Sequence, residues 1–203
     1  HLAVRRQRQM CIRDSVDGLI GYAKVLHEAG ISWTLSSHAS EAANFGMFIG
    51  SYDNMRKLAL RIREAAIKLK VKRIVFGECG HAWRVAYSFL NTLAGPWDFL
   101  DQNYPVPQHI CEVTYNLIQE NKLKFDKTKN DDMTLTYHDS CNVARASRMG
   151  DVKGGQFLIP REIIKATCNN FHDMSENTIK EGTYCCGGGG GLSLIHISEP
   201  TRH

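Results

Sequence analysis

Apolar residues recur along this chain with two alternating spacings. Apolar positions three and four residues apart, the helical spacing, are found at 19–26, 55–69, 82–93, 107–118, 142–148 and 160–167. Short apolar runs of the strand type are found at 31–35, 73–76 and 135–137. Helices that alternate with short strands are typical of α/β domains. The pattern therefore predicts an α/β fold, with Pro160 in the first turn of its last helix.

Breaks in the pattern divide the chain into two halves. A Gly-Pro pair and the run YPVP at 104–107 disfavour regular structure and predict a linker at 96–106. The predicted halves are 16–95 and 107–192. In each half a strand-like run leads into a turn with a cysteine, Cys79 in the first and Cys141 in the second. This indicates two duplicated Rossmann-like halves, with a cleft at the carboxyl ends of their strands.

The charge of the chain is concentrated at its ends. The 203 residues include 25 Lys and Arg against 21 Asp and Glu, a net charge of +4. Residues 1–15 and 193–203 hold five of those basic residues and two of the acidic ones, so residues 16–192 are close to neutral. Both end segments resemble translated sequencing-adapter sequence, and we expect a non-native leader and tail around an internal fragment. The near-neutral middle disfavours nucleic acid as a partner, and no apolar run is long enough to insert into a membrane.

Cysteine usage narrows the chemistry. The chain has seven cysteines, no secretory signal and no short-range disulfide framework, so cysteines in strand-end turns indicate a metal or redox site. Cys185 and Cys186 are adjacent, whereas one zinc ion normally takes a C-x-x-C pair. A cluster of several irons accepts adjacent thiolates, and the glycines from Gly187 and Gly188 onward allow close backbone approach. The alternative is a flexible linker with two incidental thiols.

The remaining cysteines and histidines have two interpretations each. His138 and Cys141 stand three residues apart and suit either a Cys–His nucleophile or a metal-binding cysteine with a histidine behind it. No orienting group or oxyanion hole is specified, which favours the metal ligand. Cys111 and Cys168 lie among apolar residues of predicted helices, and we expect them in the core.

Several motifs resemble one known family. HDSCNVAR at 138–145 and YCCGGGGG at 184–191 resemble the cysteine-rich CCG domain of heterodisulfide reductase catalytic subunits and glycolate oxidase iron–sulfur subunits. Four further blocks resemble DsrK-type subunits of the membrane complex that serves dissimilatory sulfite reductase: LSSHASEAANFG at 35–46, GECGHAWR at 77–84, YPVPQHICE at 104–112 and NVARASRMGD at 142–151. The resemblance covers essentially all of residues 16–192.

The resemblance implies a noncubane [4Fe–4S] cluster held by a Cys…CC…CxxC pattern. By position, Cys141 matches the first cysteine, Cys185 and Cys186 match the pair, and Cys79 matches the single cysteine of a first half that has lost its own cluster. The downstream CxxC does not occur in the chain, so the ligand set is incomplete and the fragment alone is expected to be inactive.

The resemblance also implies a function in sulfur metabolism. The expected reaction is reduction or oxidation of a disulfide or trisulfide in a small DsrC-like protein. His138, His81 and Arg145 are the expected residues that supply protons or stabilise thiolates. The expected setting is cytoplasmic, at the inner membrane, through other subunits of a membrane-anchored redox complex. The alternatives are a non-catalytic electron-transfer module and a zinc-stabilised binding domain.

Overall fold

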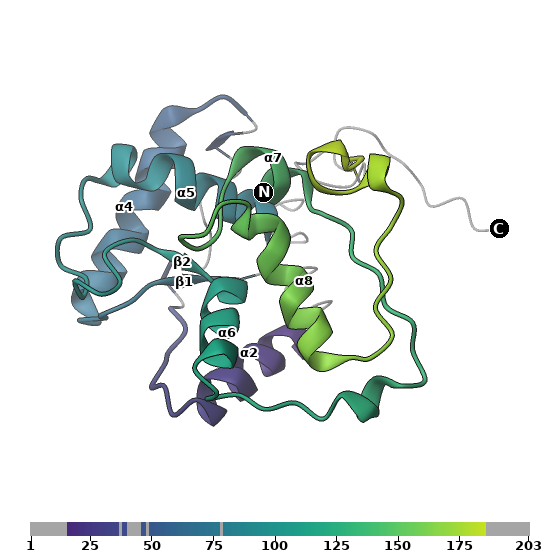
Figure 1. The fold of residues 1–203 in the computed structure, drawn as a ribbon. Coiled ribbons are helices and arrows are strands. Elements are labelled where there is room, and N and C mark those ends of the chain that lie inside the picture. The colour runs from purple at the N-terminus through teal and green to yellow at the C-terminus, as the bar shows by residue number, and fades with distance from the viewer. Residues whose placement is uncertain (1–15, 37, 40–45, 48, 78, 186–203) are drawn as a thin grey trace.

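Helices dominate the part of the chain that the computed structural model describes, which is residues 16–36, 38–39, 46–47, 49–77 and 79–185 (Figure 1). The α-helices are α2 (Val16–Glu28), α4 (Tyr52–Lys68), α5 (Gly80–Ala94), α6 (Ile110–Gln119), α7 (Cys141–Ala146) and α8 (Gly155–Thr167). Short 3₁₀ helices are η1 (Lys127–Asn130), η2 (Glu176–Thr178) and η3 (Lys180–Gly182).

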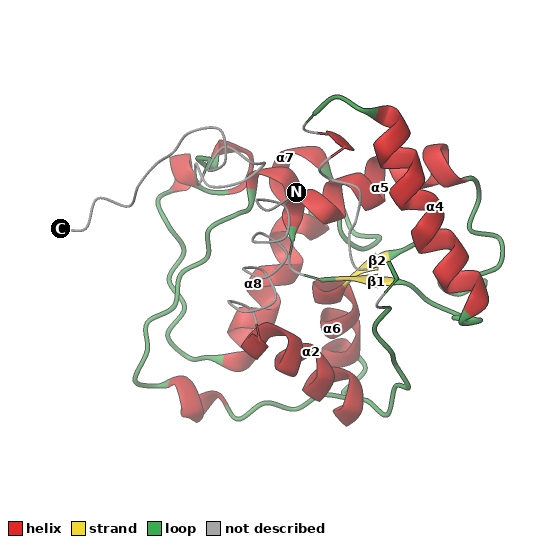
Figure 2. Cartoon of the chain, turned by 180° about the vertical axis from the view of Figure 1, so that it is seen from behind, coloured by secondary structure: helices red, strands yellow, loops and turns green. Residues whose placement is uncertain are grey.

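The sheet is small and parallel. β1 (Val75–Phe76) pairs with β2 (Gln108–His109), and α5 lies between them in the chain, so the three elements form a β–α–β unit. Figure 2 shows α4 and α5 on one side of the two strands and α6 on the other side. The mixture of helices with a parallel sheet confirms the α/β class in its general form.

The predictions of two strands are wrong. Residues 31–35 have no regular secondary structure. The run at 135–137 contributes only a single parallel bridge, between Leu135 and Phe171. Both runs are short, and a short apolar run becomes a strand only where a neighbour pairs with its backbone. Duplicated Rossmann-like halves therefore stay a prediction.

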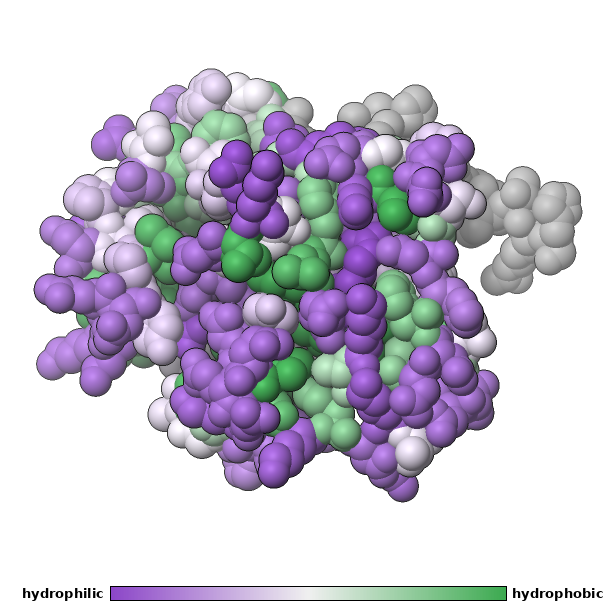
Figure 3. Space-filling view, in the orientation of Figure 1, coloured by the Kyte–Doolittle hydropathy of each residue, from purple (hydrophilic) through white to green (hydrophobic). Residues whose placement is uncertain are grey.

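Capping residues mark the start of α4 and the end of α5. The hydroxyl of Ser51 accepts a hydrogen bond from the Asn54 N–H at 3.3 Å at the start of α4, and Gly95 ends α5 with φ of 83°. α4 buries Met55 and Ala59 among other apolar residues. Its basic side chains are mostly on the outer face, and Figure 3 shows a predominantly hydrophilic surface over this region. The predicted amphipathic helix is confirmed.

The main hydrophobic core draws on both predicted halves. Its fully buried members are Ala59, Ile62, Trp83, Ala86, Leu90, Ala94, Trp97, Leu100, Val143, Met149 and Ile159. Trp97 and Leu100 belong to the segment predicted as a linker, yet they are 4% and 7% exposed. The segment at 96–106 thus contributes side chains to the core, and the division into two domains stays a proposal.

Two helix starts differ from the prediction. α6 begins at Ile110, not at Pro107, because the Gln108 N–H donates to the Ile74 carbonyl at 3.0 Å and joins the sheet. The His109 ring then caps α6: its Nδ1 accepts from the Cys111 N–H at 3.2 Å. His109 is 3% exposed, and burial lowers its pKa to about 4.

α8 begins at Gly155, so Pro160 lies inside the helix and not in its first turn. Gly154 precedes it with φ of 74°, a conformation that glycine adopts without strain. A Cβ on Gly155 would lie 1.9 Å from the Met149 carbonyl oxygen. These two glycines allow the chain to turn tightly into α8 and place the helix start against the preceding loop.

Candidate functional site

The starts of α5 and α7 meet, and each carries one of the predicted cysteine ligands. Cys79 is the N-cap of α5, and its Sγ accepts from the Ala82 N–H at 3.4 Å. Cys141 is the first residue of α7, directly after the N-cap Ser140. A Cβ on Gly80 would lie 2.4 Å from the Ser140 Oγ. The neighbours of the two cysteines are therefore in contact.

Side chains of α5 reinforce this junction. Arg84 donates to the Asn142 Oδ1 at 3.2 Å, and the Trp83 indole donates to the Arg148 carbonyl at 3.0 Å. His81 lies in the first turn of α5, where burial lowers its pKa and the Arg84 charge lowers it further. The first half of the chain thus supports α7 through hydrogen bonds that span about sixty residues of sequence.

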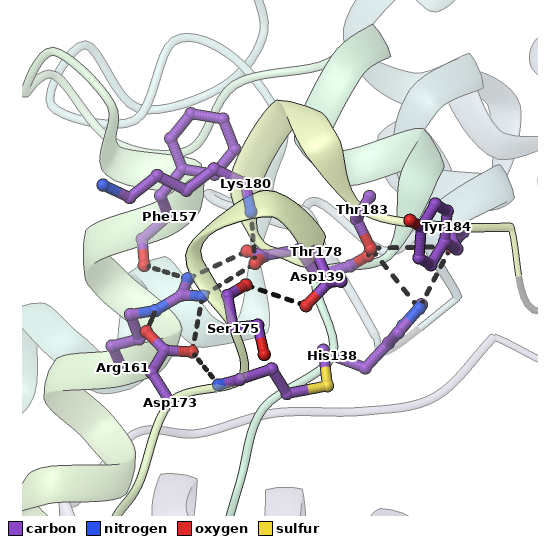
Figure 4. A network of polar contacts seen from close by, with 11 residues as sticks. His138, Asp139, Phe157, Arg161, Asp173, Ser175, Thr178, Lys180, Thr183 and Tyr184 are labelled. Carbon is purple, nitrogen blue, oxygen red and sulfur yellow. Dashed lines mark hydrogen bonds and ion pairs between the residues drawn. The ribbon is translucent and has the colours of Figure 1, made fainter.

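The segment that leads to Cys185 lies against the turn that leads to Cys141 (Figure 4). The His138 Nε2 is 3.0 Å from the Tyr184 carbonyl oxygen and 3.3 Å from the Thr183 Oγ1. The Thr183 hydroxyl donates its proton to the Asp139 carbonyl at 2.7 Å. The hydrogen bonds therefore assign the Nε2–H tautomer to His138, which donates to both oxygens.

Arg145 makes a second connection to the same segment. Its NH1 donates to the Glu181 carbonyl at 2.9 Å and to the Thr183 carbonyl at 2.6 Å. Both His138 and Arg145, predicted to supply protons or stabilise thiolates, thus bind main-chain oxygens just before Cys185. Thr183 is only 2% exposed, whereas residues 181, 182, 184 and 185 are exposed, so the docking depends on the Thr183 side chain and on these main-chain hydrogen bonds.

A buried ion-pair network lies beneath the docked segment. Asp139 is 1% exposed and accepts from the two terminal nitrogens of Arg161 at 2.9 and 2.7 Å. Asp173 accepts from the Arg161 Nε and NH2 at 2.5 and 3.0 Å. The carboxylates, Asp139 above all, raise the pKa of Arg161, and Arg161 lowers the pKa of Asp173.

Sequence reasoning missed this network. Asp139 stands inside the motif that suggested a metal site, but Arg161 is 22 residues away and Asp173 a further 12. Ion pairs at such separations leave no periodic pattern in a single sequence. The available signal was an acidic residue two positions after a strand-like run, within the candidate cysteine turn.

The other predicted site residues fall into two groups. Cys186, Gly187 and Gly188 lie outside the described residues. Cys168 is 2% exposed, and Cys111 is partly buried and packs against the main core, where burial raises its pKa to about 11. Both cysteines therefore pack with the apolar interior, as predicted. Cys185 is exposed.

The donors on this face are sulfur atoms, the ligands that iron–sulfur clusters use. Among the described residues, no three His, Cys, Asp or Glu side chains gather closely enough to hold a single metal ion. Cys141 and Cys185 nevertheless come from segments that are hydrogen-bonded to each other: His138 stands three residues before Cys141, and Tyr184 directly precedes Cys185. Two cysteines that are 44 residues apart in the sequence thus belong to segments that are docked onto each other.

Comparison with known proteins finds relatives that are named as iron–sulfur subunits. The chain is 37% identical to the Hdr-like menaquinol oxidoreductase iron–sulfur subunit 2 of Archaeoglobus fulgidus, over 89% of this chain and 37% of the relative. It is 35% identical to the corresponding subunit of Archaeoglobus profundus, over 89% of this chain and 36% of that protein. The chain is homologous to Hdr-like iron–sulfur subunits.

A more distant relative extends the Hdr-like similarity. A subunit of the dihydromethanophenazine:CoB–CoM heterodisulfide reductase of Methanosarcina barkeri is 31% identical over 69% of this chain and 30% of its own length. The chain spans little more than a third of the length of the Archaeoglobus subunits. No protein-family model and no solved structure matches the chain. None of the described helices is both long and apolar enough to cross a membrane.

Proposed function

We propose that this chain is part of an iron–sulfur thiol:disulfide oxidoreductase of the heterodisulfide reductase type. The observation that carries the proposal is the docking of the segment before Cys185 onto the turn before Cys141 by His138 and Arg145. Those two cysteines match the first cysteine and the pair of the CCG pattern. The Hdr-like relatives, named as iron–sulfur and heterodisulfide reductase subunits, support the same class of protein.

In this proposal Cys141, Cys185 and Cys186 hold a noncubane [4Fe–4S] cluster, together with the downstream CxxC pair. Cys79 approaches the same site from the start of α5, and Gly187 and Gly188 leave room for the cluster. Such a cluster, when bound, supplies single electrons for cleaving or forming a sulfur–sulfur bond. His138, Arg145 and the buried Asp139 fix the backbone that presents the thiolates.

The proposed substrate is a disulfide or trisulfide in a small DsrC-like protein, in sulfur metabolism, and the proposed close relatives are DsrK-type subunits. The proposed setting is the cytoplasmic side of the inner membrane, where other subunits of a redox complex anchor the protein. The Archaeoglobus relatives are named menaquinol oxidoreductase subunits, which supports such an association.

A second candidate function is electron transfer without disulfide chemistry. The names of the Archaeoglobus relatives specify menaquinol and no sulfur substrate, which favours a subunit whose cluster relays electrons. A zinc-stabilised binding domain is a weaker alternative, because Cys185 and Cys186 are adjacent whereas one zinc ion normally takes a C-x-x-C pair.

Metal analysis separates these functions. The gene product that includes the downstream CxxC pair is reconstituted anaerobically with ferrous iron and sulfide, and its iron, sulfide and zinc are counted. We expect about four irons per chain, most of them lost in Cys185→Ala and retained in Cys168→Ala, whose thiol lies in the core. Zinc without iron would contradict the proposal.

A spectroscopic step tests the chemistry. We expect an electron paramagnetic resonance signal when the iron-loaded protein is oxidised in the presence of a thiol substrate, and no such signal in Cys185→Ala. A cluster that changes redox state but never responds to thiols would favour the relay function.

A further inference from the structure

The contacts of His138 and Arg145 point to a role that differs from proton transfer. We propose that these two side chains form a docking clamp, which places Cys185 beside the Cys141 turn before any metal is bound and thereby controls how long a cluster is retained. In this role they are positioning residues. The part of the inference that concerns the cluster rests on the proposed function, whereas the docking itself does not.

The Arg145 contacts fix the conformation of the docked segment. One nitrogen, NH1, reaches the carbonyls of Glu181 and Thr183, two residues apart in the chain, at 2.9 and 2.6 Å. Both hydrogen bonds are charge-assisted, and such bonds are stronger than neutral ones. Because the two acceptors are backbone atoms, the contact specifies the path of the main chain irrespective of the side chains.

The His138 contacts lie close to both thiols. The ring belongs to the residue three positions before Cys141, and the Tyr184 carbonyl that it binds immediately precedes Cys185. The Thr183 hydroxyl closes a short cycle, since it accepts from His138 and donates to the Asp139 carbonyl. Few rotatable bonds therefore separate the clamp from either sulfur, so that its rigidity is transmitted to the ligand pair.

The base beneath the clamp is fixed independently of it. The Asp139 carboxylate accepts the Lys180 N–H at 2.7 Å while both of its oxygens bind Arg161. Within residues 181–185 the side chain of Thr183 is buried, at 2% exposed, whereas the other four residues are exposed, Tyr184 at 67%. The clamp is thus the last described hydrogen-bonded attachment before the cysteine pair.

Limited proteolysis of the metal-free protein tests the docking. Arg145→Gln removes the charge and the contact to two carbonyls. Arg148→Gln is the matched control, because Arg148 is also an exposed arginine, three residues later, and its side chain makes no described contact. We expect thermolysin to cleave within residues 180–185 about tenfold faster in Arg145→Gln, because local opening governs cleavage of such a segment. Arg148→Gln should match the parent protein, and Arg145→Lys should restore part of the protection.

Iron retention tests the second half of the inference. The gene product that includes the downstream CxxC pair serves here as the parent protein. It and its Arg145→Gln and Arg148→Gln variants are loaded with ferrous iron and sulfide, and release of iron to a chelator is followed by the loss of visible absorbance. We expect release about tenfold faster in Arg145→Gln, as for loss of a group that orients metal ligands. Thr183→Val, which removes the hydroxyl and keeps the shape, should accelerate release in the same direction.

Each experimental outcome supports or refutes one part of the inference. Equal cleavage rates in Arg145→Gln and Arg148→Gln would overturn the clamp itself, whatever the iron content. Faster cleavage with unchanged iron release would keep the docking and refute its control of the cluster. A parent protein that takes up no iron would refute the proposed function and this control together, while the proteolysis result would still stand for the docking.

Discussion

Replacing Asp139 by asparagine tests whether the buried ion-pair network holds the candidate site together. The Asp139 carboxylate is 1% exposed and accepts three hydrogen bonds, two from Arg161 and one from the Lys180 N–H. Asp139→Asn keeps the shape of the side chain. The variant removes the negative charge and turns one acceptor into a donor that faces the guanidinium.

The expected loss of stability follows from the burial of the pair. Removing one partner from a buried ion pair costs about 3–5 kcal/mol, and the lower end applies because Arg161 keeps Asp173 as a second partner. In a protein of this size each kcal/mol lowers the melting temperature by about 2–4 °C, so we expect a fall of about 6–12 °C. Asp173→Asn is the matched control: its side chain is 30% exposed, and we expect a loss of about 1 kcal/mol or less.

Thermal unfolding followed by circular dichroism at pH 7 measures both variants, and urea unfolding checks that the dependence on denaturant is unchanged. The reasoning predicts a clear order, with Asp139→Asn much less stable than Asp173→Asn. Equal melting temperatures for the two variants would refute the structural role assigned to the buried pair.

Three further predictions concern other sites. His109 has a folded pKa of about 4 against an ordinary value near 6.5, so between these pH values the unfolded chain binds more protons than the folded one. In urea titrations the free energy of unfolding should therefore fall by about 2 kcal/mol from pH 7 to pH 5, and the fall should be smaller in His109→Gln. Gly155→Ala should lower the melting temperature strongly, because the new Cβ would lie 1.9 Å from a carbonyl oxygen. Gly21→Ala, whose new Cβ would enter open space, should raise the melting temperature slightly. In mass-spectrometric alkylation of the metal-free protein at pH 8, exposed Cys185 should react rapidly and Cys111, whose pKa is about 11, should stay unmodified while the fold is intact.

Local signals predicted most of the helices. The apolar stripe on α4 depends on neighbours three or four residues away, and the structure confirms it. Strands need partners at long range, which explains the two incorrect strands. The start of α6 was misplaced for the same reason: Gln108 joins a strand that ends 32 residues earlier, and no local pattern encodes that pairing.

For the candidate site the sequence proposes residues, and it does not reveal their contacts. The sequence pointed to Cys141 and Cys185 because cysteine types and spacings carry chemistry that one sequence reveals. It assigned His138 and Arg145 to the chemistry of the site, whereas the structure shows them bound to main-chain oxygens. Main-chain acceptors have no side-chain identity, so no motif search detects them.

The Asp139 contact to the Lys180 N–H has a consequence for synthesis of the protein. The two residues are 41 positions apart, and a ribosome adds about 5–20 residues per second, so the turn with Cys141 emerges about 2–8 s before its docking partner. During that interval the Asp139 carboxylate lacks its hydrogen bond from Lys180, and α7 lacks the segment that covers it. Translation itself therefore delays the pairing of the two thiols, and under the proposed function metal insertion follows the emergence of the later cysteine from the ribosome.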